Sequence, residues 1–509
     1  MRIATGLIVL LLALAPPAIG RPAAPSAEAR TAALLDRIAA SPPRLRMFLQ
    51  AMPKGADLHN HGGGSIYAED FLAWAAADGL CIATDRPRIV DPPCDAPNRV
   101  PAAGLERNYP RYSTMIDALS TRGFEAGVGD PTVSGYDRFF ATFERFFSAS
   151  ADNGGRMLAA TREQAAADRV GYVELGVGSR DGMMLAVRMG AASFETREAD
   201  AFAELLARMA PLLPAGIAAT RATFDHYEAD SATIGRCASA KPQPGCALRM
   251  RYLYTAIRTQ PPAQVFAQLA FGFALAEADP RFVGINIAAP EHDPVAVRDY
   301  GLHMRMIGWL AQRFPRVGLS LHAGELTLGL VPPRDLRFHI GDAVTVAGAR
   351  RIGHGVDIAY ETDAAGLLKR MARDRIAVEI NLTSNAVILG VKGPAHPLSL
   401  YREAGVPVAL STDDEGVSRS DMTNEYMRAV AEQGLRYRDL KQIARDSVQY
   451  SFLPGSSLWK DRAGGLKFAD CVSVTSSSCA AFLAMNSKAA VQAQLEKDLA
   501  SFEARQLHD

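Results

Sequence analysis

Two of the ten histidines in this 509-residue chain, His59 and His61, are separated by one residue in the stretch DLHNHGGGSI (57–66). Pro53 and Gly55 precede them and disfavour a helix, so the stretch is predicted to be a strand. Alternate side chains of a strand point to the same face, which places both imidazoles on one side. Such a pair suits a metal ion, which needs several neutral nitrogen ligands directed at one point. Taken alone, the pair is more typical of exposed polar residues at a strand end, so a metal site requires further ligands.

The elements that could supply those ligands are apolar, β-branched runs that recur along the chain. They are separated by amphipathic stretches typical of helices, such as DAAGLLKRMARD. The eight runs cover residues 55–61, 170–177, 248–257, 282–288, 316–325, 351–356, 376–385 and 406–414. Eight strands that alternate with helices predict an α/β fold, a (β/α)8 TIM barrel, with its active site at the C-terminal ends of the strands.

Polar residues gather at those C-terminal ends, whereas almost every run is apolar before its last residues. They are His59, His61, His322, Glu325, His354, Ser384, Asn385, Asp413 and Asp414. In a barrel the strand ends converge on one mouth, so these residues become neighbours. His59, His61, His322 and Asp413 would form a zinc shell of three nitrogens and one oxygen, with room for a water. His354 alone would be a hydrogen-bonded core histidine, but the complete set favours a metal site.

The composition is that of an ordinary globular protein, with 48% hydrophobic and 22% charged residues. The 55 basic and 55 acidic residues balance, so no broad attraction to nucleic acid or to an anionic membrane is expected. The expected partner is a small neutral molecule or a protein. The length allows roughly two to four domains or one large barrel with insertions.

The first twenty residues predict a secretory signal. Arg2 supplies the positive charge, the run 7–15 is apolar, and Ala18-Ile19-Gly20 provides a small-x-small cleavage site. The alternative, a membrane anchor, is disfavoured because the apolar run is too short to span a bilayer comfortably. We therefore expect a secreted or periplasmic protein with no stable membrane insertion after signal cleavage.

The predicted organisation follows from the signal and the run of strands. It comprises a signal peptide (1–20), an N-terminal helical segment (21–50), a barrel (51–455) with an insertion at about 78–135, and a C-terminal helical extension (456–509).

The six cysteines fall in three local pairs, Cys81 with Cys94, Cys237 with Cys246, and Cys471 with Cys479. An even number in close pairs fits disulfides formed in an oxidising compartment, which agrees with export. A zinc-binding thiolate cluster would need Cys-x-x-Cys spacing, which the sequence does not contain. Three disulfides are therefore predicted.

Five motifs, LHNH, LHAGE, RIGHG, TSN and STDD, resemble the motif set of the adenosine deaminase family, a branch of the metal-dependent amidohydrolases. The resemblance runs in order from about Pro53 to the segment ARDSVQYSFLPG (444–455). The signal, the insertion and the stretch MPKGADLHNH look most like the secreted adenosine deaminase-related growth factors. In those proteins the insertion carries a disulfide and serves dimerisation and receptor contacts. The segment from Cys81 to Cys94 occupies the matching place, which leaves a homodimer open.

The resemblance implies one Zn²⁺ per chain and the hydrolytic deamination of adenosine, and of 2′-deoxyadenosine, to inosine and ammonia. Zinc lowers the pKa of a bound water towards neutrality and so supplies a nucleophile for C6 of the purine. Glu325 would protonate ring N1 as general acid, His354 would hold the attacking oxygen, and Asp414 would orient it and bind purine N7. The alternative for Asp414 is a carboxylate that only orients a metal ligand.

On the substrate side, the sequence departs from the family pattern. Residues 62–64 are glycines where the family usually has an acidic residue, and Gly176 stands where an arginine is common. Ala289 replaces a glycine whose N–H binds purine N3, and it can still donate that bond. An aromatic helix in the stretch 135–147 is by default core packing, but in the family such a helix covers the purine. Tyr136 and Phe139 are therefore candidate pocket residues.

Other functions stay open at this point. The substrate could be adenine or a 5′-substituted adenosine, or the chain could be an extracellular binding or signalling factor with a residual barrel. A two-metal amidohydrolase would need a lysine in FVGINIAAPE, which contains none. A cytidine-deaminase zinc site also needs Pro-Cys-x-x-Cys, which does not occur in the sequence.

Overall fold

The computed structural model describes residues 25–190, 198–459, 471 and 476–505. The predicted signal at 1–20 lies outside the described residues, as do parts of the predicted terminal segments. Export therefore stays a prediction.

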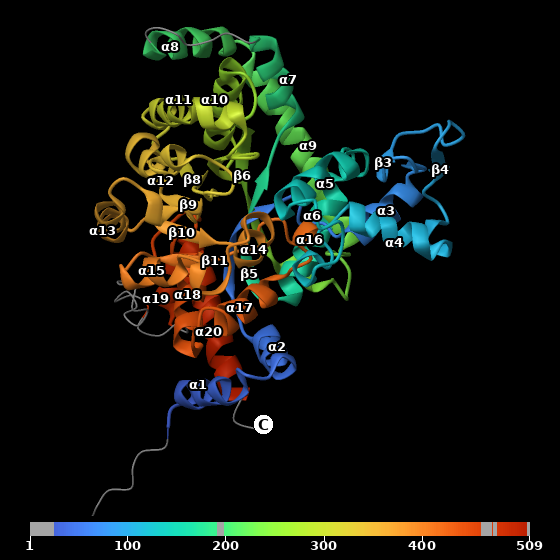
Figure 1. The fold of residues 1–509 in the computed structure, drawn as a ribbon. Coiled ribbons are helices and arrows are strands. Elements are labelled where there is room, and N and C mark those ends of the chain that lie inside the picture. The colour runs from blue at the N-terminus through green and yellow to red at the C-terminus, as the bar shows by residue number, and fades with distance from the viewer. Residues whose placement is uncertain (1–24, 191–197, 460–470, 472–475, 506–509) are drawn as a thin grey trace, which may run out of the picture.

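Eight parallel strands form the central sheet, in the order in which they occur along the chain (Figure 1). They are β1 (Gly55–His61), β5 (Val170–Val177), β6 (Arg249–Ile257), β7 (Phe282–Ala288), β8 (Gly318–Ala323), β9 (Arg351–His354), β10 (Ala377–Ile380) and β11 (Val408–Leu410). A bridge between Asn60 and Asp413 joins the first strand to the segment that follows the last, so the sheet closes. The predicted (β/α)8 TIM barrel is confirmed.

The seventh predicted strand is too long. β10 ends at Ile380, and the TSN motif (383–385) lies in the helix α14 (Leu382–Leu389). The eight-residue run NLTSNAVI is buried on all sides. A fully buried segment has no polar face, so the hydrophobic pattern did not separate a short strand from the helix that follows it.

Helices connect the strands and surround the barrel (Figure 1). They are α6 (Gly154–Ala167), α7 (Arg180–Met189), α8 (Glu198–Met209), α9 (Leu213–Ile234), α10 (Pro262–Ala278), α11 (Pro294–Ala311), α12 (His339–Asp342), α13 (Ala364–Asp374), α15 (Leu398–Glu403), α16 (Glu415–Ser418), α17 (Met422–Ala431) and α18 (Tyr437–Gln449). Their apolar faces and the strands share one large hydrophobic core. In the part of the chain that is described, no single helix is long and apolar enough to cross a membrane. The pair α8 and α9, bent by 67° at their junction, meets those criteria of length and composition together.

The insertion between β1 and β5 packs around a second hydrophobic cluster, which includes Ile82, Phe139 and Phe146 and also Val387 and Ile388 of α14. Its elements are α3 (Ala68–Ala77), the small sheet of β2 (Cys81–Ala83), β3 (Arg88–Val90) and β4 (Arg99–Pro101), then α4 (Tyr109–Ala118) and α5 (Gly135–Ser150). The helix α5 begins where the Ser134 hydroxyl accepts a hydrogen bond from the Asp137 N–H. Figure 1 shows α3, α4 and the small sheet together on one side of the barrel.

Extra helices at both ends of the chain pack together, which confirms another part of the predicted architecture. They are α1 (Ala27–Ile38), α2 (Pro42–Ala51), α19 (Ser477–Met485) and α20 (Ser487–Arg505). The ring of Phe48 in α2 meets that of Phe502 in α20 edge to face, with centroids 5.1 Å apart. Both rings belong to the main core, so the two ends of the chain close over the barrel.

All six cysteines are paired as predicted, Cys81 with Cys94, Cys237 with Cys246, and Cys471 with Cys479. None of them lines the cavity at the mouth of the barrel. The bridges therefore constrain the chain without taking part in the chemistry of that cavity.

Replacing both Cys237 and Cys246 by serine should lower the free energy of unfolding by about 2–5 kcal/mol, because a short loop regains its freedom in the unfolded chain. Urea unfolding followed by circular dichroism measures the change. The Ser239→Ala variant, which alters an exposed side chain inside the same loop, is the control and should be close to neutral. An unfolding midpoint equal to that of the parent protein would contradict the predicted role of the bridge.

Candidate active site

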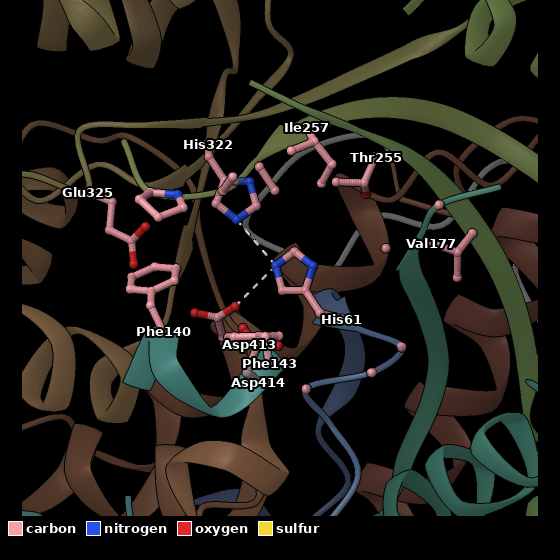
Figure 2. A pocket seen from close by; sticks show the side chains of 18 of the residues that line it. His61, Phe140, Phe143, Val177, Thr255, Ile257, His322, Glu325, Asp413 and Asp414 are labelled. Atoms are coloured by element: carbon pink, nitrogen blue, oxygen red, sulfur yellow. Dashed lines mark hydrogen bonds and ion pairs between the residues drawn. The ribbon is translucent and has the colours of Figure 1, made fainter. Parts of the chain in front are cut away.

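A cavity of about 510 Å³ opens at the C-terminal ends of the strands (Figure 2). Its wall contains residues from β1, β5, β6, β7, β8 and β9, from the segment after β11, and from the insertion helix α5. The predicted residues that line it are His61, Phe139, Ala289, His322, Glu325, His354, Asp413 and Asp414. His59 lies directly behind the wall, with its Nε2 atom 3.1 Å from that of His322. The structure thus brings most of the predicted site together.

Three imidazole nitrogens and one carboxylate oxygen converge at the wall of this cavity. The Nε2 atom of His322 is 3.1 Å from that of His59 and 3.2 Å from that of His61. The Asp413 Oδ1 atom lies 3.4 Å from His59 Nε2 and 3.2 Å from His61 Nε2. Two ligand atoms that are each about 2.1 Å from a tetrahedral ion are roughly 3.4 Å apart, so these spacings suit one small cation.

The opposite nitrogens of two of these rings are held by buried acceptors. His59 Nδ1 lies 2.9 Å from Oε2 of Glu379, and His322 Nδ1 lies 2.9 Å from Oδ1 of Asn286. An acceptor at Nδ1 keeps the proton on that nitrogen and leaves the lone pair of Nε2 directed at the common point. Metal-binding histidines are oriented in this way by their outer hydrogen-bond partners.

The electrostatics of the cluster favour a positive charge at that point. Burial opposes protonation of His59, but the carboxylates of Asp413 and Glu379 outweigh it and raise the pKa of His59 to about 10. Lone pairs that face one another at these distances repel unless a proton or a cation lies between them. A metal that bound here would displace the proton, as is usual for histidine ligands. His59, His61, His322 and Asp413 can therefore hold one divalent ion.

Glu325 follows β8 and faces the cavity from beside these ligands (Figure 2). Its backbone is fixed by Glu291, whose carboxylate accepts hydrogen bonds from the N–H groups of Gly324 at 3.0 Å and Glu325 at 2.9 Å. Burial, together with the charges of Asp413 and Glu291, raises the pKa of Glu325 to about 8. A carboxyl group with that pKa is protonated at neutral pH and can act as a proton donor.

His354 is the last residue of β9, and its ring is held by a side-chain amide of the helix α14. The Asn385 side-chain amide donates to His354 Nδ1 at 2.9 Å, and its oxygen accepts from His396 Nε2 at 3.0 Å. Because Nδ1 accepts, the proton of the neutral ring is on Nε2, a buried atom with no hydrogen-bond partner among the described residues. Burial lowers the pKa of His354 to about 3, which keeps the ring neutral. The Nε2–H group is thus available to a molecule in the cavity.

Asp414 lies next to the ligand Asp413 and packs against the glycine loop after β1. A Cβ atom built on Gly64 would be only 1.5 Å from Asp414 Oδ1, so the third glycine of that loop is required by the position of this carboxyl. Burial raises the pKa of Asp414 to about 8, and its Oδ1 atom is buried without a hydrogen-bond partner among the described residues. The neutral carboxyl can therefore donate to a nitrogen of a bound ligand.

The aromatic helix α5 contributes one wall. Phe139, Phe140 and Phe143 line the cavity. Tyr136 does not line it, and its ring packs edge to face on that of His292 with centroids 4.0 Å apart. Ala289, which also lines the cavity, has a positive φ of 88°, a backbone conformation that favours glycine.

Three outer residues of the site were not predicted, namely Glu379, Asn286 and Asn385 as the partner of a histidine. Glu379 and Asn286 each interrupt an otherwise apolar, buried strand. A charged or amide side chain in a buried strand must be paired, so this interruption was the available signal. The sequence could not identify the partners of Glu379 and Asn286, because each of these residues contacts a histidine on another strand.

Comparison with known proteins yields three kinds of match. The family model described as adenosine deaminase matches residues 226–459. An adenosine deaminase from Shewanella loihica is 37% identical over 115 residues, which are 22% of this chain and 34% of that relative. The alignment therefore spans about a third of the relative's length.

Solved structures share the fold of the chain at low sequence identity. An amidohydrolase from Burkholderia ambifaria with bound zinc covers 91% of this chain and 95% of its own, at 18% identity and a TM-score of 0.53. The N6-methyl-AMP deaminase from Arabidopsis thaliana covers 80% of this chain and 94% of its own, at 17% identity and a TM-score of 0.50. The solved structures show a likeness of fold, and the match to the family model confirms the resemblance to the adenosine deaminase family.

The contact between Gly64 and Asp414 leads to a stability prediction. The Gly64→Ala substitution should lower the free energy of unfolding by about 1–3 kcal/mol, because the new methyl group displaces a buried carboxyl. Chemical denaturation measures it. In the matched control Gly63→Ala, the added Cβ would lie 3.7 Å from the Phe146 ring, an ordinary contact, and should change little. Equal stability of the two variants would show that Asp414 does not occupy the space beside Gly64.

Proposed function

We propose that this chain, as a relative of the adenosine deaminases, removes the 6-amino group of adenosine, and of 2′-deoxyadenosine, by hydrolysis to give inosine and ammonia. The observation that carries the proposal is the convergence of three Nε2 atoms and the Asp413 carboxylate beside the buried carboxyl group of Glu325 in one cavity. A residual barrel that served only binding would have no need of a complete ligand set and a proton donor.

A zinc ion is the metal that we propose for the cluster. His59, His61, His322 and Asp413 would hold it, since three nitrogens and one oxygen with an open position suit catalytic zinc. Zinc, when bound, would act as a Lewis acid and lower the pKa of water towards neutrality. The buried partners Glu379 and Asn286 would keep two of the rings in the tautomer that this role requires.

Glu325 would deliver the proton that the purine needs. An aromatic carbon becomes tetrahedral only if its ring accepts the displaced electron pair, so water adds to C6 as N1 takes a proton. Glu325 carries that proton at neutral pH because burial and the neighbouring carboxylates raise its pKa to about 8. The proton that water loses on attack would restore that of Glu325, and the remaining hydroxyl proton would pass to the amino group. The C6–N6 bond then breaks, ammonia leaves, and C6 becomes the carbonyl of inosine.

His354 and Asp414 would position the two reactants. The Nε2–H group of His354 has no hydrogen-bond partner among the described residues and can donate to the oxygen that attacks C6. The neutral carboxyl of Asp414 can donate to N7 of the purine, which fixes the ring plane. The N–H of Ala289 would bind N3, and the rings of Phe139 and Phe140 would cover the base.

We also propose that the reaction takes place outside the cytoplasm. The three disulfides support this setting, because such bridges persist in oxidising compartments.

The metal assignment predicts the zinc content of variants. Purified wild-type protein should carry one zinc per chain, and His59→Ala and Asp413→Ala should carry none. Glu379→Gln should bind zinc about 10–100-fold more weakly, because the His59 ring loses its anionic partner. Elemental analysis and competition with a chelator measure these effects. The control is His226→Ala, an exposed histidine on α9, which should retain its zinc. Activity in metal-free protein, or two metals per chain, would refute the assignment.

The acid assignment predicts a separation of zinc binding from turnover. Glu325→Gln should fold and retain zinc while its kcat for adenosine falls by about 10²–10⁴-fold, the usual contribution of general acid–base catalysis. The loss of absorbance of adenosine measures kcat. The control is Glu144→Gln, the same chemical change at an exposed position of α5, which should be as active as the parent. Near-normal turnover by zinc-loaded Glu325→Gln would remove Glu325 from the mechanism.

A further inference from the structure

The cavity continues beyond the catalytic groups, and this second part decides what the substrate can carry. Figure 2 shows Glu325 and Phe140 on one side of His61, and Val177, Thr255 and Ile257 on the other. If C6 of the purine must face the catalytic cluster, the group attached at the far end of the nucleoside extends into this second part. Its wall is formed by the glycine loop 62–64, the ends of β5 and β6, and the start of α7. The inference below rests on the proposed function.

The glycine loop contributes no side chain to its part of the cavity wall. None of the three glycines has a positive φ, so the backbone does not require glycine there. Only Gly64 is required by packing, against Asp414. A Cβ built on Gly62 would lie 3.6 Å from Val177 Cγ1, and one on Gly63 would lie 3.7 Å from the Phe146 ring, so both positions have room for a side chain. The chain therefore presents no side-chain hydrogen-bonding group at two positions that could hold one.

Three polar side chains in this part of the wall are already engaged, and the phenol of Tyr254 lines it as well. The Ser179 hydroxyl accepts from the Gly182 N–H at 3.1 Å and contacts Thr220 Oγ1 at 2.7 Å. Gln268 accepts from the Ile257 N–H at 3.0 Å, and its amide donates to a backbone carbonyl.

The third polar group, the Thr255 hydroxyl, donates to the carbonyl of Leu253. The remaining surface comes from apolar side chains, Val177, Met183 and Ile257. A hydroxyl group on the substrate would find few free partners among these side chains, whereas an apolar group would bury its surface.

Lysine and arginine are absent from the described residues that line the cavity. Of the lining residues, Glu325, Asp413 and Asp414 are acidic. Arg180 follows Ser179 but is exposed and does not line the cavity. Arg258 is buried behind the wall and donates to the Ala289 carbonyl at 2.8 Å. The glycine loop is not an anion site either, because backbone nests that bind phosphate need residues of alternating φ sign.

We propose that the cavity accepts purine nucleosides whose 5′ carbon carries an apolar substituent, such as a 5′-alkylthio group, and that it rejects 5′-phosphates. The 5′ hydroxyl of adenosine is then tolerated and not recognised. A 5′-phosphate is rejected because it would lose its hydration without meeting a cation.

Steady-state kinetics with adenosine, 5′-deoxyadenosine, 5′-methylthioadenosine and AMP tests the proposal. The two compounds that lack the 5′ hydroxyl should have kcat/KM values within about tenfold of that of adenosine, since no strong hydrogen bond is lost. AMP should fall at least about 100-fold below adenosine, because a charged group is left unpaired. Arg180→Ala should leave this ranking unchanged.

The glycine loop can be tested by supplying the group that it lacks. Gly63→Asp should shift the preference towards adenosine over 5′-methylthioadenosine by about tenfold or more, because the carboxylate can accept from the 5′ hydroxyl and crowds an apolar group. The control is Gly329→Asp, which adds the same charge at an exposed position outside the cavity and should not shift the preference. If Gly63→Asp does not fold, the wild-type panel still decides.

The outcomes separate this inference from the proposed function. Turnover of adenosine together with a loss of more than 100-fold for both 5′-modified nucleosides would overturn the inference and leave the proposed function intact. Turnover of AMP comparable to that of adenosine would do the same. If a zinc-loaded, folded protein deaminates none of the four compounds, the proposed function fails and the inference fails with it.

Discussion

A buried chain of charges inside the barrel is the constraint on which the site depends. Arg351 on β9 donates to Glu174 on β5 at 2.6 Å and also to Glu379 on β10. Glu379 in turn holds His59 on β1 and accepts from Ser320 on β8 at 2.7 Å. Removing one member of a buried ion pair typically costs about 3–5 kcal/mol, since the remaining charge has no partner. The same contacts that neutralise Arg351 thus fix the direction of a histidine ring at the mouth, and stability and site geometry are coupled through Glu379.

Backbone strain occurs where three strands deliver their functional side chains, and at five other positions among the described residues. Ala289, His354 and Asp413 line the cavity, and each is a non-glycine residue with a positive φ, of 88°, 67° and 57°. Each such conformation costs on the order of 1–3 kcal/mol and persists only if the surroundings enforce it. For Asp413 the enforcement is visible, because its N–H donates to the His59 carbonyl at 2.8 Å and so closes the barrel. The hydrogen bond that closes the barrel therefore also sets the direction of the Asp413 side chain.

The sequence predicted the barrel and the inner site because both have local signals. The strands are short apolar runs, and the polar residues stand where the runs end, as with His322 and Asp413. Prediction failed where a fully buried helix followed a strand, at residues 383–385, since neither element shows an alternating pattern. It also missed the roles of Glu379 and Asn286, because a contact between strands leaves no trace in the spacing along the chain. The need for a glycine at position 64 could not be predicted either, because it arises from contact with Asp414, 350 positions away.

The barrel and the insertion each contribute part of the cavity wall, and these contributions are fixed in different ways. The barrel supplies the histidines and acids, whose positions are fixed by the main core and by buried hydrogen bonds. The helix α5 covers the opening with Phe139, Phe140 and Phe143, yet it packs mainly into the separate cluster of the insertion. It contacts the barrel side closely at Gly135, where a Cβ would lie 1.8 Å from the Val387 carbonyl of α14, and at Tyr136, whose ring packs on that of His292. Changes inside the insertion can therefore alter the shape of the substrate cavity through the aromatic wall of α5, whereas the converging ligands are fixed by contacts within the barrel.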